Sequence, residues 1–235
     1  MGVSYKLTAM FSLAHGKGER LALWNLGLWN AGLIGLLVSV WARPSTLLVP
    51  GFACLLAVSA AIFVFDIGRV LRHRRRRRFS LDQWHGFVSL ASFLVAAGMG
   101  VLLAAGRLPT TTWVVAYGWV ALAGWFGFSI IGKYYKIVPF LIWLRRFSAV
   151  AGAAPTPLLR DLVNQRAGWV SFGLLTAGYA GVLAGVLGQS VPVLQVSGVL
   201  YALGAWLFAY NVARLLRSGT STRKARSPAP QKAAS

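Results

Sequence analysis

The chain has 235 residues, of which 57% are hydrophobic and only 12% are charged, and its mean hydropathy is +0.64. Four acidic residues accompany ten Trp and thirteen Phe, a composition that excludes an ordinary water-soluble globular domain. The formal net charge of +20 would suit nucleic-acid binding by itself, but the distribution of the basic residues favours another explanation. The lone Cys54 excludes a disulfide framework and a Cys-based metal site.

Long apolar segments follow one another along the chain, at about 21–41, 45–68, 84–105, 110–132, 168–188 and 192–213. Each can cross roughly 30 Å of hydrocarbon as a helix at 1.5 Å per residue. Their apolar residues do not alternate with polar ones, and lipid requires backbone hydrogen bonds to be satisfied within the segment. The sequence therefore predicts an all-α polytopic bundle of six transmembrane helices over residues 1–218. A basic tail rich in Ser, Pro and Ala, 219–235, is expected to be disordered.

The stretch after the fourth apolar segment, KYYKIVPFLIWLRRF, contains Pro139 and ends in aromatic and basic residues. Proline interrupts helices, and Trp and Arg favour the membrane–water boundary. We therefore expect the chain to bend after residue 132 and to lie along the interface.

The basic residues indicate the orientation in the membrane. The segments 1–20, 69–83, 133–167 and 214–235 hold 22 of the 24 Lys and Arg residues. Positive residues stay on the cytoplasmic side, so both termini are predicted to be cytoplasmic, in the inner membrane of a bacterium. The run RHRRRRR (72–78) is then an orientation signal that contacts anionic lipid headgroups, in preference to nucleic acid. The ratio of 18 Arg to 6 Lys is typical of a GC-rich bacterial gene.

The chain contains an internal repeat. Residues 1–13, MGVSYKLTAMFSL, align with 131–143 at an offset of 130, and 20–37 align with 166–183 at an offset of 146. Residues 62–72 align with 207–217 at an offset of 145. All copies of the Tyr-Lys signature fall on the predicted cytoplasmic side, so the repeat is parallel. Copy one (1–78) has two spans and copy two (79–218) has four, so we expect copy one to be truncated at its front.

Histidine is the residue that would suggest redox chemistry. His15 and His73 lie in basic segments and are expected to be solvated. His85 opens the third apolar segment, where it is either an axial haem ligand or proton relay, or an interfacial residue beside Trp84; we favour the interfacial role. No pair of histidines has helical spacing, so no metal site is predicted.

The dipeptide Tyr5-Lys6 recurs as Tyr135-Lys136. Tyrosine would anchor the interface while lysine reaches the headgroups, or lysine would bind an anionic lipid or a cofactor carboxylate. Both explanations remain open, and the first is favoured.

Polar residues within the spans are expected to join helices. Asp66 precedes Arg69 by one turn, which allows an ion pair, and its repeat mate is Asn211. Asn25 and Asn30 are predicted to make interhelical hydrogen bonds. The sequence contains no nucleophile–base arrangement, phosphate-binding loop or paired carboxylates, so no catalytic residue is predicted.

The stretch YGWVALAGWFGFSIIGKYYKIVPFLIWLRRF (117–147) resembles bacterial membrane proteins related to subunit I of haem-copper (cytochrome c) oxidases. Their pattern is a helix with His-x-x-x-x-x-Gly-Trp followed by Gly-x-x-Tyr-Lys-[Ile/Leu]-x-Pro-Phe, and GVSYKLTAMFSLAHG is similar to the same element of an earlier helix. The resemblance covers about 60 residues and implies a haem-protein-like helical bundle in respiratory electron transfer or gas sensing. This chain has Ala116-Tyr117-Gly118-Trp119 where the pattern has histidine, so no haem or copper ligand carries over.

The function predicted from the sequence is that of a non-catalytic or accessory membrane protein of this oxidase-like group, haem-associated when complete. Two alternatives stay open, a small transporter or channel and a structural subunit of a membrane complex. The expected partners are the bilayer, its anionic headgroups and a membrane protein, with no nucleic acid.

Overall fold

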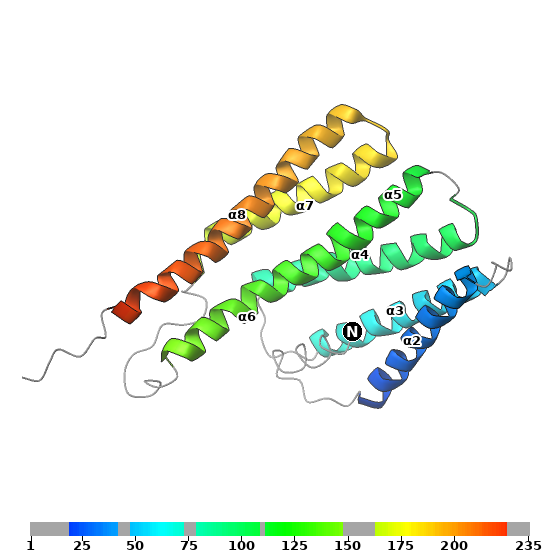
Figure 1. The fold of residues 1–235 in the computed structure, drawn as a ribbon, viewed down its shortest axis with the longest axis horizontal. Helices are drawn as coiled ribbons and strands as arrows, with labels where there is room; N and C mark the ends of the chain where they lie inside the picture. The colour runs from blue at the N-terminus through cyan, green and yellow to red at the C-terminus, as the bar shows by residue number, and fades with distance from the viewer. Residues whose placement is uncertain (1–18, 42–47, 73–78, 109–110, 148–162, 225–235) are drawn as a thin grey trace, which may run out of the picture. The chain divides into compact units, whose positions relative to one another are not determined.

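The computed structural model describes residues 19–41, 48–72, 79–108, 111–147 and 163–224, and the described secondary structure is helical. Helices long and apolar enough to cross a membrane occupy Leu23–Trp41, Leu48–Arg69, Leu81–Ala104, Thr111–Arg145, Gln165–Leu187 and Val191–Arg217. The six candidate spans in the described part of the chain confirm the predicted all-α, multi-pass membrane fold (Figure 1).

The fourth span differs from its prediction. α5 (Thr111–Trp119), the π-helix η1 (Val120–Gly127) and α6 (Phe128–Phe147) follow one another without a break, and Pro139 lies inside α6. The predicted bend after residue 132 is therefore wrong. Proline removes one backbone donor, that to the carbonyl of Tyr135, and neighbouring helices in membrane proteins compensate for such a loss. Pro139 is buried, so the turn of α6 that lacks this backbone hydrogen bond is packed against neighbouring residues.

α2 (Glu19–Trp41) and α3 (Leu48–Arg72) form the first helical hairpin (Figure 1). The Ser59 hydroxyl donates a hydrogen bond to the side-chain oxygen of Asn25 over 2.7 Å. Farther along α2, a Cβ added at Gly32 would lie 3.0 Å from the Leu56 side chain, and one at Gly35 would meet the Phe52 ring. Small residues thus let the two backbones approach closely.

α7 (Gln165–Leu187) and α8 (Val191–Lys224) form a second hairpin with the same design. The Ser171 hydroxyl donates to the carbonyl of Gly204 over 2.8 Å. A Cβ added at Gly178 would lie 2.7 Å from the Cα of Tyr201, and one at Gly181 would lie 2.8 Å from the Cβ of Ser197.

The two hairpins pack in the same register. The offset of 146 carries α2 onto α7 and the offset of 145 carries α3 onto α8. These offsets map three contacting pairs of the first hairpin onto three contacting pairs of the second: Asn25–Ser59 onto Ser171–Gly204, Gly32–Leu56 onto Gly178–Tyr201, and Gly35–Phe52 onto Gly181–Ser197. The sequence repeat is therefore also a repeat of interhelical contacts.

α4 (Leu81–Ala104) packs against both α3 and η1. Its first turn is fixed by a capping box, in which the Ser80 backbone N–H donates to the Gln83 side chain over 3.1 Å. The core between α3 and α4 contains Ala60, Phe63, Ile67 and Phe93, with Trp29 and Trp125 packed against it. The Phe93 and Trp125 rings lie 4.2 Å apart between centroids.

The chain divides into two compact units, Met1–Ile130 with Val186–Ser190, and Ile131–Gly185 with Val191–Ser235. This division differs from the boundary between repeat copies at residue 78 because α4, the first helix of copy two, packs against α3 of copy one. At the other end of the chain α8 continues to Lys224, six residues into the segment expected as a disordered tail; residues 225–235 lie outside the described part.

Candidate functional site

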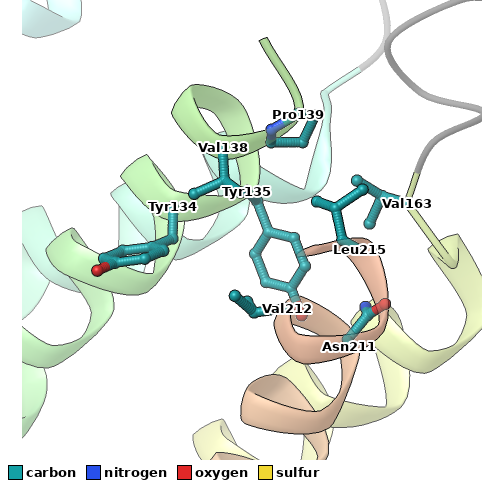
Figure 2. A pocket seen from close by; sticks show the side chains of 8 residues that line it. All are labelled: Tyr134, Tyr135, Val138, Pro139, Val163, Asn211, Val212 and Leu215. Carbon is teal, nitrogen blue, oxygen red and sulfur yellow. The ribbon is translucent and has the colours of Figure 1, made fainter. Parts of the chain in front are cut away.

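The clearest polar site in the second unit is built around Tyr135 of the repeated signature. The Tyr135 ring points from α6 toward α8, and its centroid lies 5.4 Å from that of Phe208 (Figure 2). Its hydroxyl is buried and lies within interaction range of the Asn211 and Ser171 side chains. A buried tyrosine hydroxyl is stabilised by such polar neighbours, so this side chain joins α6 to both helices of the second hairpin.

Asn211 extends this site to the start of α7. Its amide nitrogen donates to the carbonyl of Asn164 over 3.2 Å. The Asn164 side-chain oxygen in turn accepts from the backbone N–H of Ala167 over 3.2 Å, which caps the first turn of α7. One asparagine on α8 therefore helps to fix where α7 begins and where α6 docks.

A small pocket surrounds these residues, and Figure 2 shows the side chains that line it: Tyr134, Tyr135, Val138, Pro139, Val163, Asn211, Val212 and Leu215. The lining contains no ionisable group other than the two phenols. Such a lining supplies helix packing and a few hydrogen bonds, and it offers neither an acid–base pair nor a charge for a substrate.

The position along the span explains why tyrosine occurs here. From Thr111, a helix crosses roughly 30 Å of hydrocarbon in about 20 residues, so the signature lies near the membrane boundary. Of the two neighbouring tyrosines, Tyr134 is exposed and Tyr135 is half-buried among the helices. Tyr135, which the sequence favours as the interface anchor, faces α8, and its neighbour Tyr134 is the tyrosine that faces outward. Lys136 is half-buried, and Tyr5 and Lys6 lie outside the described residues.

In the first unit, His85 is completely buried, with 0% of its surface exposed. Its Nδ1 lies 2.9 Å from the carbonyl oxygen of Leu81, and its ring centroid lies 5.9 Å from that of Phe128. Trp84, its neighbour, is exposed instead. The helix therefore turns the His85 side chain toward the core and turns Trp84 outward.

This geometry does not fit an axial haem ligand. Iron would have to approach Nε2 if Nδ1 stays against the Leu81 carbonyl, and Nε2 is enclosed by protein atoms. Phe128, itself 1% exposed, covers one side of the imidazole. A porphyrin could bind His85 only after these helices had separated, so no chemical step is assigned to haem here. His15 and His73 lie outside the described residues.

Sequence reasoning missed a buried polar ladder on α4. Ser89 and Ser92 follow His85 at helical spacing and are also buried. The Ser89 hydroxyl donates over 2.8 Å to the carbonyl of Trp125, which lies in the π-helix η1. A π-helix rearranges the backbone hydrogen bonds of its turns, and a serine donor can bind a carbonyl there. The spacing of four and three residues between His85, Ser89 and Ser92 was the signal that could have revealed this face.

The polar residues of the first hairpin divide into two kinds. Asn25 is 2% exposed and makes the predicted interhelical bond with Ser59. The prediction for Asn30 is wrong, because its exposed amide donates to the carbonyl of Leu26 in its own helix over 2.8 Å. Asp66 is buried and Arg69 is exposed, and the described residues show no ion pair between them.

Among the described residues, no group of three His, Cys, Asp or Glu side chains could hold a metal ion. Comparison of the chain with protein families, with curated proteins and with solved structures finds no significant match. Fold and geometry define a multi-pass helical membrane protein.

Proposed function

We propose that this protein is an accessory, non-catalytic subunit of a bacterial inner-membrane complex, of the group related to subunit I of haem-copper oxidases. The observation that supports this proposal most strongly is the use of polar side chains inside the spans. Asn25, Ser59, Ser89 and Ser171 each hydrogen-bond across to another helix. Such bonds hold a bundle together and leave these groups engaged in packing.

A transport function is less favoured by the same contacts. Substrate and ion paths in membranes are lined by ionisable or polar groups that face a water-filled cavity. Here His85, Ser89 and Ser92 are all buried, and the almost fully buried Phe128 lies against the His85 ring. A helical bundle with apolar outer faces and internally paired polar groups is suited to lateral contact with lipid and with other membrane helices.

The proposed orientation places both termini in the cytoplasm. Arg69, Arg145, Arg166 and Arg214 lie at those helix ends that face one side if successive spans alternate in direction, and Arg107 lies at an opposite end. Basic residues near span ends favour the cytoplasmic side and its anionic headgroups. Arg72 ends α3, and the rest of the basic run, 73–78, lies outside the described residues and would add to this contact.

The proposal is tested by deleting the gene in its bacterial source and measuring assembled haem-copper oxidase in the membranes. We expect less assembled oxidase on native gels and in reduced-minus-oxidised spectra, restored by the wild-type gene. The purified protein itself should give no haem difference spectrum. Unchanged oxidase content would contradict the oxidase relationship. A purified protein with stoichiometric haem that is lost on His85→Ala substitution would contradict the accessory role and assign a haem function.

A further inference from the structure

One side of α2 is used for packing within the first unit and the opposite side is not. α2 packs chiefly against α3, through Asn25, Gly32 and Gly35 (Figure 1). Asn30 precedes Gly32 by two residues, which places it about 200° away around a helix of 3.6 residues per turn. Asn30 is exposed, so the side of α2 that lies opposite α3 is open.

The exposed residues on this open side follow a heptad spacing. They recur at alternating intervals of four and three residues, and we call them the α2 seam: Leu23, Gly27, Asn30, Ile34, Leu37 and Trp41. This spacing keeps one side of a helix against a parallel partner helix in a left-handed pair. Open space surrounds the Cβ position of Gly27, so a second backbone can approach closely there.

Asn30 places a carboxamide in the middle of the α2 seam. At 1.5 Å per residue it lies about 11 Å from Leu23 and about 17 Å from Trp41, the two ends of the span. The amide nitrogen donates to the Leu26 carbonyl, and among the described contacts the second N–H and the carbonyl oxygen have no partner. Hydrocarbon offers them none, so a helix contact that supplies hydrogen bonds lowers their free energy.

We propose that α2 pairs with α2 of a second copy of this chain along the α2 seam, with the two Asn30 carboxamides hydrogen-bonded to each other. All copies have the same basic residues and therefore the same orientation in the membrane. Two α2 helices related by a two-fold axis along the membrane normal are then parallel, and each seam residue faces its own counterpart at the same depth. This inference is independent of the proposed oxidase-related role.

The chemistry of the seam favours a second copy over an unlike helix. A carboxamide holds both a donor and an acceptor, so it is complementary to another copy of itself. The single Asn also sets the register, because a slide by one turn would bring each Asn30 opposite Gly27 or Ile34 and leave both amides unpaired. The remaining seam residues are apolar or glycine and fit a helix of the same sequence by packing alone.

Disulfide crosslinking in native membranes tests this pairing. In a Cys54→Ser background, Ile34→Cys lies in the seam, and Leu33→Cys lies at nearly the same depth but about 100° around the helix. Both side chains are exposed, so neither substitution opens a cavity within the chain. We expect oxidation of Ile34→Cys to give a product of twice the 25.3 kDa chain mass, and Leu33→Cys to give several-fold less, since a disulfide requires Cα atoms within about 7 Å.

A second substitution added to Ile34→Cys tests the role of the amide. Asn30→Leu should lower the yield of the two-chain product about threefold to tenfold, as for the loss of one interhelical hydrogen bond in a membrane, whereas Asn30→Gln keeps an amide and should retain most of it. Gly27→Leu should also lower the yield because it fills the space for the second backbone. The matched control is Ala61→Leu at an exposed position of α3, which should leave the yield unchanged.

Three results would overturn the proposal. They are equal yields from Ile34→Cys and Leu33→Cys, an unchanged yield in Asn30→Leu, and a product whose mass is not that of two chains, which would assign the seam to a different membrane protein. Energy transfer between fluorescently tagged copies in lipid vesicles gives a measurement without introduced cysteines. Transfer should fall on dilution with lipid, at a several-fold higher protein-to-lipid ratio in Asn30→Leu than in the wild type, and absence of transfer in the wild type would exclude the pair.

Discussion

The Ser59 hydroxyl and the Asn25 side-chain oxygen form a 2.7 Å hydrogen bond that joins α3 to α2. At the equivalent positions of the second hairpin, Ser171 on α7 donates to the backbone carbonyl of Gly204 on α8 over 2.8 Å. The donor has moved from one helix to the other, and the acceptor has changed from side chain to backbone. Each hairpin nevertheless keeps one interhelical hydrogen bond at the repeat-equivalent position, so position is retained while the chemistry differs.

Replacement of Ser59 by alanine should destabilise the first hairpin, because the buried Asn25 amide loses its partner on α3. We expect a loss of about 0.5–1.5 kcal/mol in the free energy of unfolding, within the range for hydrogen bonds between membrane helices. Unfolding in mixed micelles measures it. Asn30→Ala is the matched control, since Asn30 bonds only to its own helix among the described contacts, and it should cost less. An equal loss in both variants would contradict the interhelical role of Ser59.

A graded series of glycine substitutions should separate close contact from helix propensity. Gly178→Ala would place a methyl group 2.7 Å from the Tyr201 Cα, a backbone atom that can yield only if α7 and α8 move apart. We expect a loss of about 1–3 kcal/mol from such overpacking. Gly32→Ala, the repeat equivalent, would meet the movable Leu56 side chain at 3.0 Å and should cost less. Gly173→Ala has open space around its Cβ and should be neutral or stabilising. Thermal unfolding in detergent would show this order, and a Gly173→Ala variant as unstable as Gly178→Ala would refute it.

His85→Ala should destabilise the first unit through loss of packing. The imidazole is fully enclosed and lies against Phe128, so its removal leaves a cavity beneath that ring. Large-to-small changes at such sites cost about 2–5 kcal/mol. Leu94→Ala on the same helix is the control, because Leu94 is exposed and its truncation opens no cavity. The measurement is the unfolding temperature in detergent, and equal temperatures for the two variants would show that His85 is not a core residue.

The sequence was sufficient to locate the six spans of the described residues. Lipid requires long apolar helices, so segment length alone placed most span ends within a few residues of the helices described. The sequence contains the repeat that pairs Gly32 with Gly178 and Asn25 with Ser171, and the structure adds that these positions lie at interhelical contacts. Repeated small and polar residues are informative because they are needed where two helices touch.

The features that the sequence did not reveal depend on three-dimensional surroundings. Pro139 predicts a helix end by local rules, yet its buried setting among α6 and α8 residues allows the helix to continue. Asn25 and Asn30 are the same residue type on one helix, and only the neighbour Ser59 makes one of them interhelical. His85 and Trp84 are adjacent in sequence, and the phase of α4 determines which of them is buried. Tertiary contacts decide each of these cases.

Tyr135→Phe provides the sharpest test of the signature site because a second tyrosine stands next to it. The substitution keeps the ring against Phe208 and removes the hydroxyl that lies near Asn211 and Ser171. We expect a loss of about 0.5–1.5 kcal/mol in unfolding free energy, since these buried polar groups lose a neighbour. Tyr134→Phe should have almost no effect, because Tyr134 is 46% exposed while its ring makes a comparable contact with Phe208, 6.0 Å between centroids.

A double-mutant cycle with Asn211→Ala assigns the loss to a specific pair. Tyr135→Phe and Asn211→Ala should be non-additive, with a coupling energy of the same sign and similar size as the single loss. Asn211 also donates to the Asn164 carbonyl, so its own substitution should cost more than that of Tyr135. Additive effects in the cycle would show that the two side chains act independently. The Tyr-Lys signature would then be retained for its position at the membrane boundary, and its hydroxyl would have no part in helix docking.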